Sequence, residues 1–551
     1  MASKKGFCVE SGIYYSKKEP IPLPPPHQHL NLTTYVFSHH SHHNNADVAF
    51  IDAPTGAYLT YAALRHNVNA LASGLHRLGI RKRDVVLVIS PNSIHIPCIY
   101  LAILSIGAIL TTANPLNTDA EIRKQVKDSN PVIAFTIPEL FHKARATQLP
   151  VVVIQTASRT PEQQAGGCVS TLHDLLQSRV DDLPSVDIKQ DDTATLLYSS
   201  GTTGKSKGVV GSHRNHIAMV AAGLLQTQDK NQNDSGEKKD VYLCIMPLFH
   251  VYGFFYTVSS VAKGNCMVVM SKFELAEMLK SIERYRVTTL PAAPPLLVAL
   301  IKSSIVAEYD LSSLRIIGSG GAPLGKEVID EFITRFPNVE VRQGYGLTES
   351  NGAVTFTSTS EENKKYGTAG LLAANVEAKI VDTVSGKALP PNQRGELWLR
   401  GPTVMKGYFG NMEATAATLD SEGWLKTGDL CYIDEEGFLF VVDRIKELIK
   451  YKAYQVAPAE LEELLLSNPE IADAAVIPYP DKEAGQIPMA FIVRKSDSKL
   501  KEEDVMSFVS KQVAPYKKIR RAAFVASIPK SPTGKILRKD LIQQTLSTSK
   551  L

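Results

Sequence analysis

The stretch YSSGTTGKSKGV, residues 198–209, decides how the rest of the chain is interpreted. It follows the apolar residues 194–197 and combines three glycines, two lysines and a run of serine and threonine hydroxyls. Successive backbone N–H groups at such positions form a concave nest, and hydroxyl and ammonium groups supply further donors to phosphate oxygens. The stretch therefore predicts a loop that binds the phosphates of a nucleotide.

A Walker-type P-loop is the nearest alternative, because Gly204, Lys205 and Ser206 match its closing G-K-[ST] triplet. Ser199 stands where that motif needs its first glycine, so the match fails at its other end. A surface loop without a ligand is a third interpretation, since one isolated glycine-rich segment is weak evidence. The choice between these three interpretations depends on whether residues suited to binding a nucleotide occur elsewhere in the chain.

Length and composition set broad limits on the class of protein. With 551 residues the chain exceeds what one hydrophobic core usually supports, so we expect at least two domains. Its 60 basic and 56 acidic residues leave a net charge of +4, which is too balanced to imply nucleic-acid or membrane binding. The six cysteines lie far apart without CxxC pairs, which favours unpaired thiols in a reducing compartment.

The chain carries one targeting signal and one misleading apolar stretch. Ser549, Lys550 and Leu551 match the peroxisomal address S-K-L, so we expect recognition by the peroxisomal import receptor and a location in the peroxisomal matrix. Residues 94–113 are apolar enough to resemble a membrane span, but histidine, proline and glycine interrupt them and a strand-like run precedes them. A buried helix packed on a sheet is the better interpretation, and no membrane span is expected.

The pattern of apolar residues predicts an α/β fold with several domains. From about residue 49, short apolar runs alternate with amphipathic segments, as expected for stacked α/β units with parallel sheets. Beyond residue 395 the strands are shorter and separated by turns, which indicates a small β subdomain. After Arg444 a charged segment leads to a compact α+β domain of about a hundred residues. The clearest strand-like runs are residues 85–89, 132–135, 151–154, 267–270 and 314–317.

The stretch GYGLTES, residues 344–350, offers three groups suited to a nucleotide. Tyr345 can stack on a purine, Thr348 can bond a phosphate oxygen, and Glu349 can hold Mg²⁺, which prefers oxygen ligands. Any one of these residues alone would more simply be structural. Together with the glycine-rich loop they favour a nucleotide site.

Two further stretches add to this set. SGGAP, residues 319–323, follows a strand-like run, so its glycines fall at the carboxyl end of a strand, where ligands bind in open α/β sheets. Asp429 and Arg444 offer a carboxylate and a guanidinium, both of which can bond ribose hydroxyls.

In order and spacing these stretches resemble the adenylate-forming superfamily of acyl-CoA synthetases, firefly luciferases and peptide-synthetase adenylation domains. The resemblance extends from about residue 50 to residue 540, and within it the chain is most similar to the plant 4-coumarate:CoA ligase-like peroxisomal acyl-CoA ligases. The motifs that carry it are YSSGTTGKSKGV, PLFHVYGF, SGGAPLGKE, GYGLTES, GELWLRGP, WLKTGDL, DRIKELIKYKAYQVAPAELE and PKSPTGKILRKDL.

The resemblance implies a two-step reaction that uses ATP, Mg²⁺ and coenzyme A. A carboxylate attacks the α-phosphate of ATP to give acyl-AMP and pyrophosphate, and the thiol of coenzyme A then displaces AMP. It also implies a large domain, residues 1–445, of stacked α/β sheets with a small β subdomain. A small, mobile α+β domain, residues 446–551, is expected to rotate about a hinge near Lys446.

The resemblance assigns roles to individual residues. Lys535 matches the adenylation lysine, expected to bridge the substrate carboxylate and phosphate oxygens, while Lys450 and Gln455 match positions tied to catalysis. His250 matches the aromatic gate of the acyl pocket, and Glu349 is the expected metal ligand. Nucleotide contacts are expected from Ser199, Ser200, Gly201, Thr202, Thr203, Gly204, Lys207, Gly320, Gly321, Ala322, Gln343, Gly344, Tyr345, Gly346, Thr348, Asp429, Arg444 and Lys446.

The segments expected to line the acyl pocket offer small and apolar groups and no obvious charge, which favours an apolar acid. Gly318 and Pro291 stand where hydroxycinnamate ligases often carry Lys and Met, so a phenol hydroxyl would lack one expected partner. We therefore expect a fatty acid or an oxylipin precursor as substrate. The full set of expected pocket residues is His250, Val251, Tyr252, Phe255, Pro291, Gly318 and Gly346.

Three alternative functions stay open at this point: a 4-coumarate or hydroxycinnamate ligase, a luciferase-type adenylating oxygenase, and a non-catalytic nucleotide-binding module. Three departures from the family pattern matter for them. Ser206 replaces a common proline of the phosphate loop, and Ala453 replaces a glycine near the expected pantetheine path. GELWLRG, residues 395–401, differs from the GEICIRG typical of 4-coumarate ligases, which weakens the assignment to coumarate.

Overall fold

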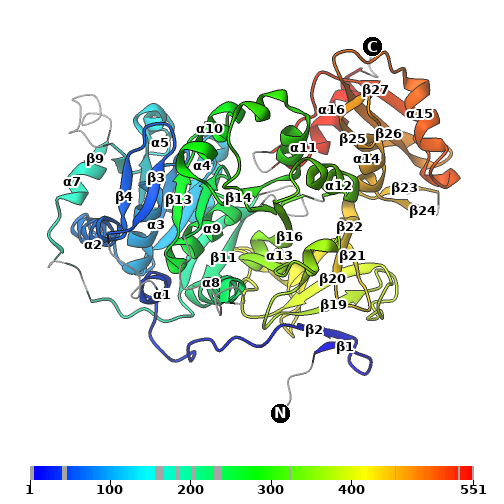
Figure 1. The fold of residues 1–551 in the computed structure, drawn as a ribbon. Helices are drawn as coiled ribbons and strands as arrows, with labels where there is room; N and C mark the ends of the chain where they lie inside the picture. Colours follow the sequence, from blue (N-terminus) through cyan, green and yellow to red (C-terminus); the bar gives the residue numbers. More distant parts are fainter. Residues whose placement is uncertain are drawn as a thin grey trace.

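The computed structural model has a large N-terminal α/β part and a smaller C-terminal α+β part, as the sequence predicts (Figure 1). It describes residues 5–39, 46–155, 167–180, 183, 185–199, 206–228, 239–322, 324–452, 454–531 and 534–548. Ser200 to Gly204 of the phosphate loop, Ala453, and the S-K-L tripeptide lie outside the described residues.

The first sheet has seven strands in the order β11-β10-β6-β5-β7-β8-β9. All neighbouring pairs are parallel except β10 and β11, which form an antiparallel hairpin around the glycine-rich loop. The sheet therefore presents the phosphate loop at one end of a buried strand. The strands are β5 (Val85–Ile89), β6 (Ile109–Ala113), β7 (Ile133–Thr136), β8 (Val151–Val153), β9 (Cys168–Thr171), β10 (Thr193–Ser199) and β11 (Lys207–Ser212).

The second sheet has nine strands in the order β18-β17-β16-β15-β14-β12-β13-β3-β4. Its central strands are parallel, so the carboxyl ends of β14, β15 and β16 lie at one edge, where a ligand site is expected. The strands are β3 (Val48–Asp52), β4 (Tyr58–Thr60), β12 (Val241–Cys244), β13 (Cys266–Val269), β14 (Thr289–Ala292), β15 (Ile316–Ser319), β16 (Glu340–Leu347), β17 (Gly352–Phe356) and β18 (Leu371–Leu372).

Helices cover these sheets and supply most of the core. Buried residues of α1, α2, α3, α8 and α9 join those of both sheets in one large apolar cluster, so the two sheets share a common core. These helices are α1 (Leu32–His39), α2 (Tyr61–Arg77), α3 (Ile96–Ser105), α8 (His213–Gln228) and α9 (Val251–Lys263). The others around the sheets are α4 (Asp119–Ser129), α5 (Phe141–Arg145), α7 (Leu172–Leu176), α10 (Leu275–Tyr285), α11 (Pro294–Lys302) and α12 (Lys326–Arg335).

The apolar stretch 94–113 is only partly the buried helix that the sequence suggests. Helix α3 ends at Ser105, Gly107 adopts a positive φ of +71°, and residues 109–113 form strand β6. Because a glycine tolerates this left-handed turn and the β-branched residues that follow favour a strand, the chain reverses into the sheet. None of the helices in the described residues has the length and apolarity needed to span a bilayer.

A six-stranded antiparallel sheet forms the β subdomain, in the order β1-β2-β19-β20-β21-β22. The N-terminal strands β1 and β2, which the sequence did not suggest, pair with it through β19 (Figure 1). Its elements are β1 (Gly6–Cys8), β2 (Ile13–Tyr15), β19 (Glu377–Val381), β20 (Gly395–Arg400), β21 (Leu425–Ile433), β22 (Leu439–Arg444) and the short helix α13 (Met412–Thr418).

The C-terminal part packs on apolar clusters of its own, formed by buried residues between Ile449 and Leu541. The chain enters it through a short 3-10 turn, η7 (Ile445–Glu447), which contains Lys446. The boundary predicted at residue 446 and the rotation about it stay predictions. The elements are β23 (Ile449–Tyr451), β24 (Tyr454–Val456), α14 (Pro458–Leu466), β25 (Ile471–Asp481), β26 (Gly485–Arg494), α15 (Glu502–Ser510), β27 (Arg521–Phe524) and α16 (Arg538–Thr548).

Candidate active site

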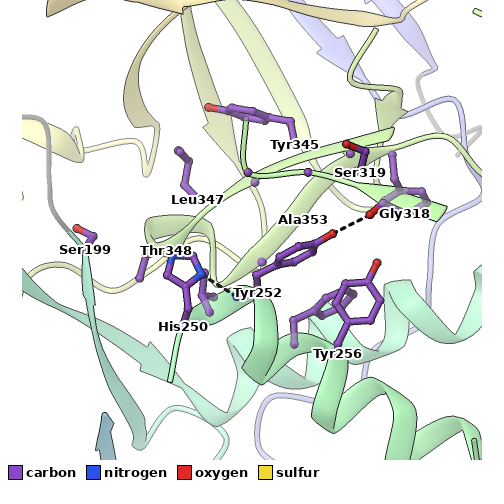
Figure 2. Close-up of a pocket in the computed structure, with 18 of the residues that line it drawn as sticks. Ser199, His250, Tyr252, Tyr256, Gly318, Ser319, Tyr345, Leu347, Thr348 and Ala353 are labelled. Atoms are coloured by element: carbon purple, nitrogen blue, oxygen red, sulfur yellow. Dashed lines mark hydrogen bonds between the residues drawn. The ribbon is translucent and has the colours of Figure 1, made fainter. Parts of the chain in front are cut away.

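A cavity of about 1890 Å³ opens where the two domains meet, beside Ser199 and Ser206. Its walls come from the carboxyl ends of β15 and β16, from the amino end of α9 and from the C-terminal domain around Lys535. Figure 2 shows the part of this cavity between Ser199, His250 and Tyr345. Side chains from four separated segments of the sequence therefore face one space.

His250 fixes the start of α9 at the mouth of the cavity. Its Nδ1 accepts a hydrogen bond from the backbone N–H of Tyr252 at 3.3 Å, in the manner of an N-cap (Figure 2). Burial lowers the pKa of His250 to about 4, so the ring is neutral at physiological pH. A neutral, uncharged ring suits the predicted role of His250 as a gate at an acyl pocket.

Behind His250 the cavity is walled by aromatic side chains of α9. The Tyr252 hydroxyl donates to the carbonyl oxygen of Gly318 at 3.2 Å, and the rings of Tyr252 and Tyr256 meet edge to face at 5.1 Å (Figure 2). Val251 and Phe255 line the same space. The wall of this pocket is therefore mainly aromatic and apolar, with phenol hydroxyls at its edge.

Gly318 is required for this packing. A Cβ at residue 318 would lie 2.9 Å from the Tyr256 hydroxyl, which is closer than real Cβ atoms approach. Pro291, by contrast, is buried in β14 opposite Gly318 and does not line the cavity, so the structure does not support its predicted place in the pocket. The position of Pro291 follows from its pairing with Gly318 in the parallel strands β14 and β15.

We expect Gly318→Ala to lower kcat/KM for the preferred acid about tenfold, in the range found when a pocket changes by one methylene. The added methyl displaces Tyr256 toward the acid without touching the nucleotide side. Steady-state kinetics at saturating ATP give kcat and KM for the acid in the variant and in the wild type. Gly223→Ala is the matched control, because a Cβ there meets Ser259 at an ordinary 3.6 Å. Equal acid KM values in wild type and Gly318→Ala would contradict the placement of the pocket.

Glu349 lies at the phosphate end of the cavity. Its Oε1 accepts hydrogen bonds from the Ser199 hydroxyl at 2.7 Å and from the Tyr408 hydroxyl at 2.9 Å. These donors orient the carboxylate and leave Oε2 without a partner among the described residues. A single carboxylate beside phosphate oxygens is a common way to hold Mg²⁺. In the described residues no three His, Cys, Asp or Glu side chains cluster to hold a metal on their own.

The two residues expected to bind the ribose, Asp429 and Arg444, belong to a buried polar network with Tyr345. The Tyr345 hydroxyl donates to Asp429 at 2.6 Å, and the Nε of Arg444 lies 3.4 Å from the other carboxylate oxygen. Asp429 is 4% exposed, and burial raises its pKa while Arg444 and the Tyr345 hydroxyl oppose the rise. Since Asp429 and Arg444 are paired in register on β21 and β22, the sheet itself holds them together.

Lys535 reaches the cavity from the C-terminal domain. A hairpin holds its backbone, because Ser531 Oγ accepts from the Lys535 N–H at 3.1 Å and the Ser531 N–H donates to the Lys535 carbonyl at 2.8 Å. Burial, together with Arg444 and Lys446, lowers the pKa of Lys535 to about 8, while Glu447 and Asp429 oppose the fall. Its ammonium has no hydrogen-bond or ion-pair partner among the described residues, so this wall is suited to an anion.

Several predicted residues lie away from the cavity wall. Lys450 and Gln455 pair in the exposed hairpin of β23 and β24 and do not line the cavity, nor does Ala322. Lys207 lies beside it, with its ammonium 4.5 Å from the centre of the Tyr408 ring. Ser200 to Gly204 cannot be placed, since they fall outside the described residues. Those that do line the cavity are Ser199, Gly320, Gly321, Gln343, Gly344, Tyr345, Gly346, Thr348, Glu349, Arg444, Lys446 and Lys535.

Sequence reasoning missed some lining residues. Tyr256 follows Tyr252 by four residues on α9 and so faces the same way, which the helical period could have indicated. Lys263, Arg342 and Tyr408 lie outside every recognised motif, and only the fold brings them to the cavity.

Comparison with known proteins agrees with this geometry. A profile described as the AMP-binding enzyme family matches residues 37–409, and a profile of the AMP-binding enzyme C-terminal domain matches residues 460–535. The chain belongs to the AMP-binding enzyme family. This AMP-binding enzyme is 55% identical over 556 residues to the probable CoA ligase CCL5 of Humulus lupulus, with 100% of this chain and 98% of the relative covered. It is 54% identical over 559 residues to the peroxisomal OPC-8:0-CoA ligase 1 of Arabidopsis thaliana, with 100% and 99% covered.

Solved structures show the same fold. ATP-bound MatB from Rhodopseudomonas palustris matches with a TM-score of 0.81 at 25% identity, covering 93% of this chain and 98% of that one. An anthranilate CoA ligase, AuaEII, in complex with anthranoyl-AMP matches with a TM-score of 0.84 at 24% identity, covering 96% and 99%. The AMP-binding enzyme is thus an AMP-forming acid–thiol ligase, as its motifs predict, and ATP and coenzyme A fit as its substrates.

Proposed function

We propose that this AMP-binding enzyme activates a largely apolar carboxylic acid, of the fatty-acid or oxylipin-precursor type, and converts it through acyl-AMP to acyl-CoA in peroxisomes. One observation carries the proposal: a single cavity joins the aromatic pocket behind His250 to the basic wall at Lys535. A carboxylate at their junction has its chain in the pocket and its charge beside the phosphate-binding groups.

In the first step a carboxylate oxygen attacks the α-phosphorus of ATP, the bond to the β,γ-pyrophosphate breaks, and pyrophosphate leaves. Negative charge on the phosphate oxygens is the main obstacle, so positioning and charge neutralisation supply most of the catalysis. Lys535 and Arg444 line the space where that charge lies. Gln343, Thr348, Gly320 and Gly321 form the rest of this wall.

We infer that Glu349 holds Mg²⁺ through the carboxylate that Ser199 and Tyr408 orient. The ion would neutralise phosphate charge when bound. Of the chain's own groups, the two hydroxyls hold the carboxylate in place by donating hydrogen bonds to it.

In the second step the thiol of coenzyme A attacks the acyl carbon, and AMP leaves. We assign Lys450 and Gln455 to this step. They are adjacent on the exposed β23–β24 hairpin of the C-terminal domain, whose core is separate from that of the large domain. Rotation of the C-terminal domain about Lys446 would move the Lys535 loop away from the cavity and bring this hairpin to it. Ala453 in the same hairpin lies outside the described residues.

An acid panel tests the substrate class. We expect kcat/KM for medium- and long-chain acids to exceed that for 4-coumarate at least tenfold. Residue 318 is a glycine and not a lysine, so this position offers no ammonium group to bond a phenol hydroxyl. Acyl-CoA and AMP are measured for each acid with ATP and coenzyme A. A preference for 4-coumarate would support the hydroxycinnamate ligase instead, emission of light the luciferase, and a folded protein without acid-dependent turnover the nucleotide-binding module.

The peroxisomal location rests on the S-K-L ending and on the name of the relative from Arabidopsis thaliana. Deletion of Ser549, Lys550 and Leu551 from a protein with a fluorescent tag at its N-terminus is expected to shift it from peroxisomes to the cytosol. Unchanged peroxisomal fluorescence would contradict the assigned address.

A further inference from the structure

The residues of α9 that line the cavity show how far the acyl pocket extends. Tyr252, Tyr256, Ser259 and Lys263 fall at positions i, i+4, i+7 and i+11 of this helix, which places them along one face. All four line the cavity. At a rise of 1.5 Å per residue, Lys263 lies roughly 16 Å further along the helix axis than Tyr252. The pocket therefore continues well past the aromatic side chains shown in Figure 2.

This distal part of the cavity contains buried polar atoms without partners. The hydroxyls of Ser259, Ser260 and Thr289 and the amide nitrogen of Asn265 have no hydrogen-bond partner among the described residues. These four residues are 5%, 3%, 5% and 7% exposed, respectively, and all line the cavity. Because these atoms are themselves buried, they make the surroundings of the distal wall polar without facing the open cavity.

The charges of the distal wall are paired with one exception. Arg315 lies 2.6 Å from Asp240, and Arg342 lies 3.0 Å from Glu340. Lys263, at the last turn of α9, has no ion-pair or hydrogen-bond partner among the described residues. The sequence suggests a pocket with no obvious charge, but Lys263 and Arg315 both line the cavity at this end.

The environment of Lys263 is consistent with a group that faces the cavity interior. Burial, together with Arg342, lowers the pKa of Lys263 to about 8, while Asp240 opposes the fall. An ammonium in such surroundings gains from an oxygen acceptor brought by a ligand, since a hydrogen bond to a charged group is stronger than one between neutral groups.

We propose that the distal end of the acyl pocket is a subsite for a hydrogen-bond-accepting oxygen, a ketone or a carboxylate, at the end of the acid remote from the carboxyl that is activated. Lys263, which lines this end of the cavity and has no ion-pair or hydrogen-bond partner among the described residues, binds this oxygen. The chain between the two ends passes the aromatic wall. This inference rests on the proposed function, because it names the kind of acid that the ligase prefers.

Three acids of one chain length test it: a saturated monocarboxylic acid, the same acid with a ketone near its far end, and the matching dicarboxylic acid. Acid-dependent exchange of labelled pyrophosphate into ATP gives kcat/KM for each acid without involving coenzyme A. The variants are Lys263→Met, which keeps the length of the side chain without its charge, and Lys263→Arg, which keeps the charge. Lys280→Met in α10 is the control, because that lysine is exposed and does not line the cavity.

In the wild type and in Lys280→Met, we expect kcat/KM for at least one oxygenated acid to exceed that for the saturated acid about tenfold. Lys263→Met is expected to abolish this preference, and a melting temperature close to that of the wild type shows that the variant folds. Lys263→Arg is expected to restore most of the preference. Whether the ketone or the dicarboxylic acid is preferred identifies the source of the oxygen.

A wild-type preference for the saturated acid, or the same preference in wild type and Lys263→Met, would overturn the subsite and leave the ligase assignment intact. Failure of the wild-type enzyme to activate any of the three acids would overturn both.

Discussion

Replacement of Lys535 by alanine is expected to lower acid-dependent pyrophosphate exchange by a factor on the order of 10²–10³, the usual effect of removing one donor that stabilises transition-state charge. The ammonium faces the cavity without a partner among the described residues, on the wall that also carries Arg444 and Lys446. ATP affinity should change little, because Arg444, Thr348 and the phosphate loop remain.

The control for this prediction is Lys530→Ala. Lys530 belongs to the same loop region, but its ammonium pairs with Asp473 at 2.6 Å and does not line the cavity. Exchange by this variant should stay within about threefold of wild type. Exchange by Lys535→Ala at the wild-type rate, with ATP bound and the melting temperature unchanged, would remove Lys535 from the first step.

Replacement of Asp429 by alanine is expected to raise the KM for ATP at least tenfold and to lower the melting temperature. The carboxylate is 4% exposed and bonds the Tyr345 hydroxyl, while Arg444 lies beside it. Without it, a buried hydroxyl and a guanidinium lose their partner, which costs about 1–3 kcal/mol of folding free energy. The ribose side of the nucleotide loses an acceptor as well.

Tyr345→Phe separates the two effects. It removes the 2.6 Å hydrogen bond but keeps the ring that can stack on a purine and leaves Asp429 beside Arg444. We expect a smaller rise in KM and a smaller loss of stability than in Asp429→Ala, measured by ATP-dependent kinetics and thermal unfolding. A KM for ATP in Asp429→Ala equal to that of the wild type would show that Asp429 has no part in nucleotide binding.

The fold was largely predictable because its strands are short, buried apolar runs. Residues 85–89 form β5 with the predicted bounds, and residues 151–154 give β8 within one residue. The stretch 94–113 was harder, since a buried helix and a buried strand are equally apolar and only Gly107 marks the change. Strands β1 and β2 escaped prediction, because three-residue strands that depend on pairing with β19 leave no periodic signal.

Some residues of the candidate site could likewise be predicted from the sequence, and others could not. Motif residues such as Glu349 and Lys535 were predictable from local sequence, and they line the cavity. The pairing of Tyr345 with Asp429 and the arrival of Lys263 at the distal end depend on how β16, β21 and α9 are placed in three dimensions. Such contacts between distant segments carry no signal in one sequence, which also explains why Pro291 was misplaced.

The central claim is that one site forms acyl-AMP and then transfers the acyl group to coenzyme A. A chase experiment tests it most directly: the enzyme is mixed with Mg²⁺, ATP and a preferred acid, coenzyme A is added later, and quenched samples are analysed by mass spectrometry. We predict that enzyme-bound acyl-AMP and pyrophosphate accumulate before the addition, and that acyl-CoA and AMP replace the acyl-AMP after it. Formation of ADP, or acyl-AMP that persists in the presence of coenzyme A, would contradict this account.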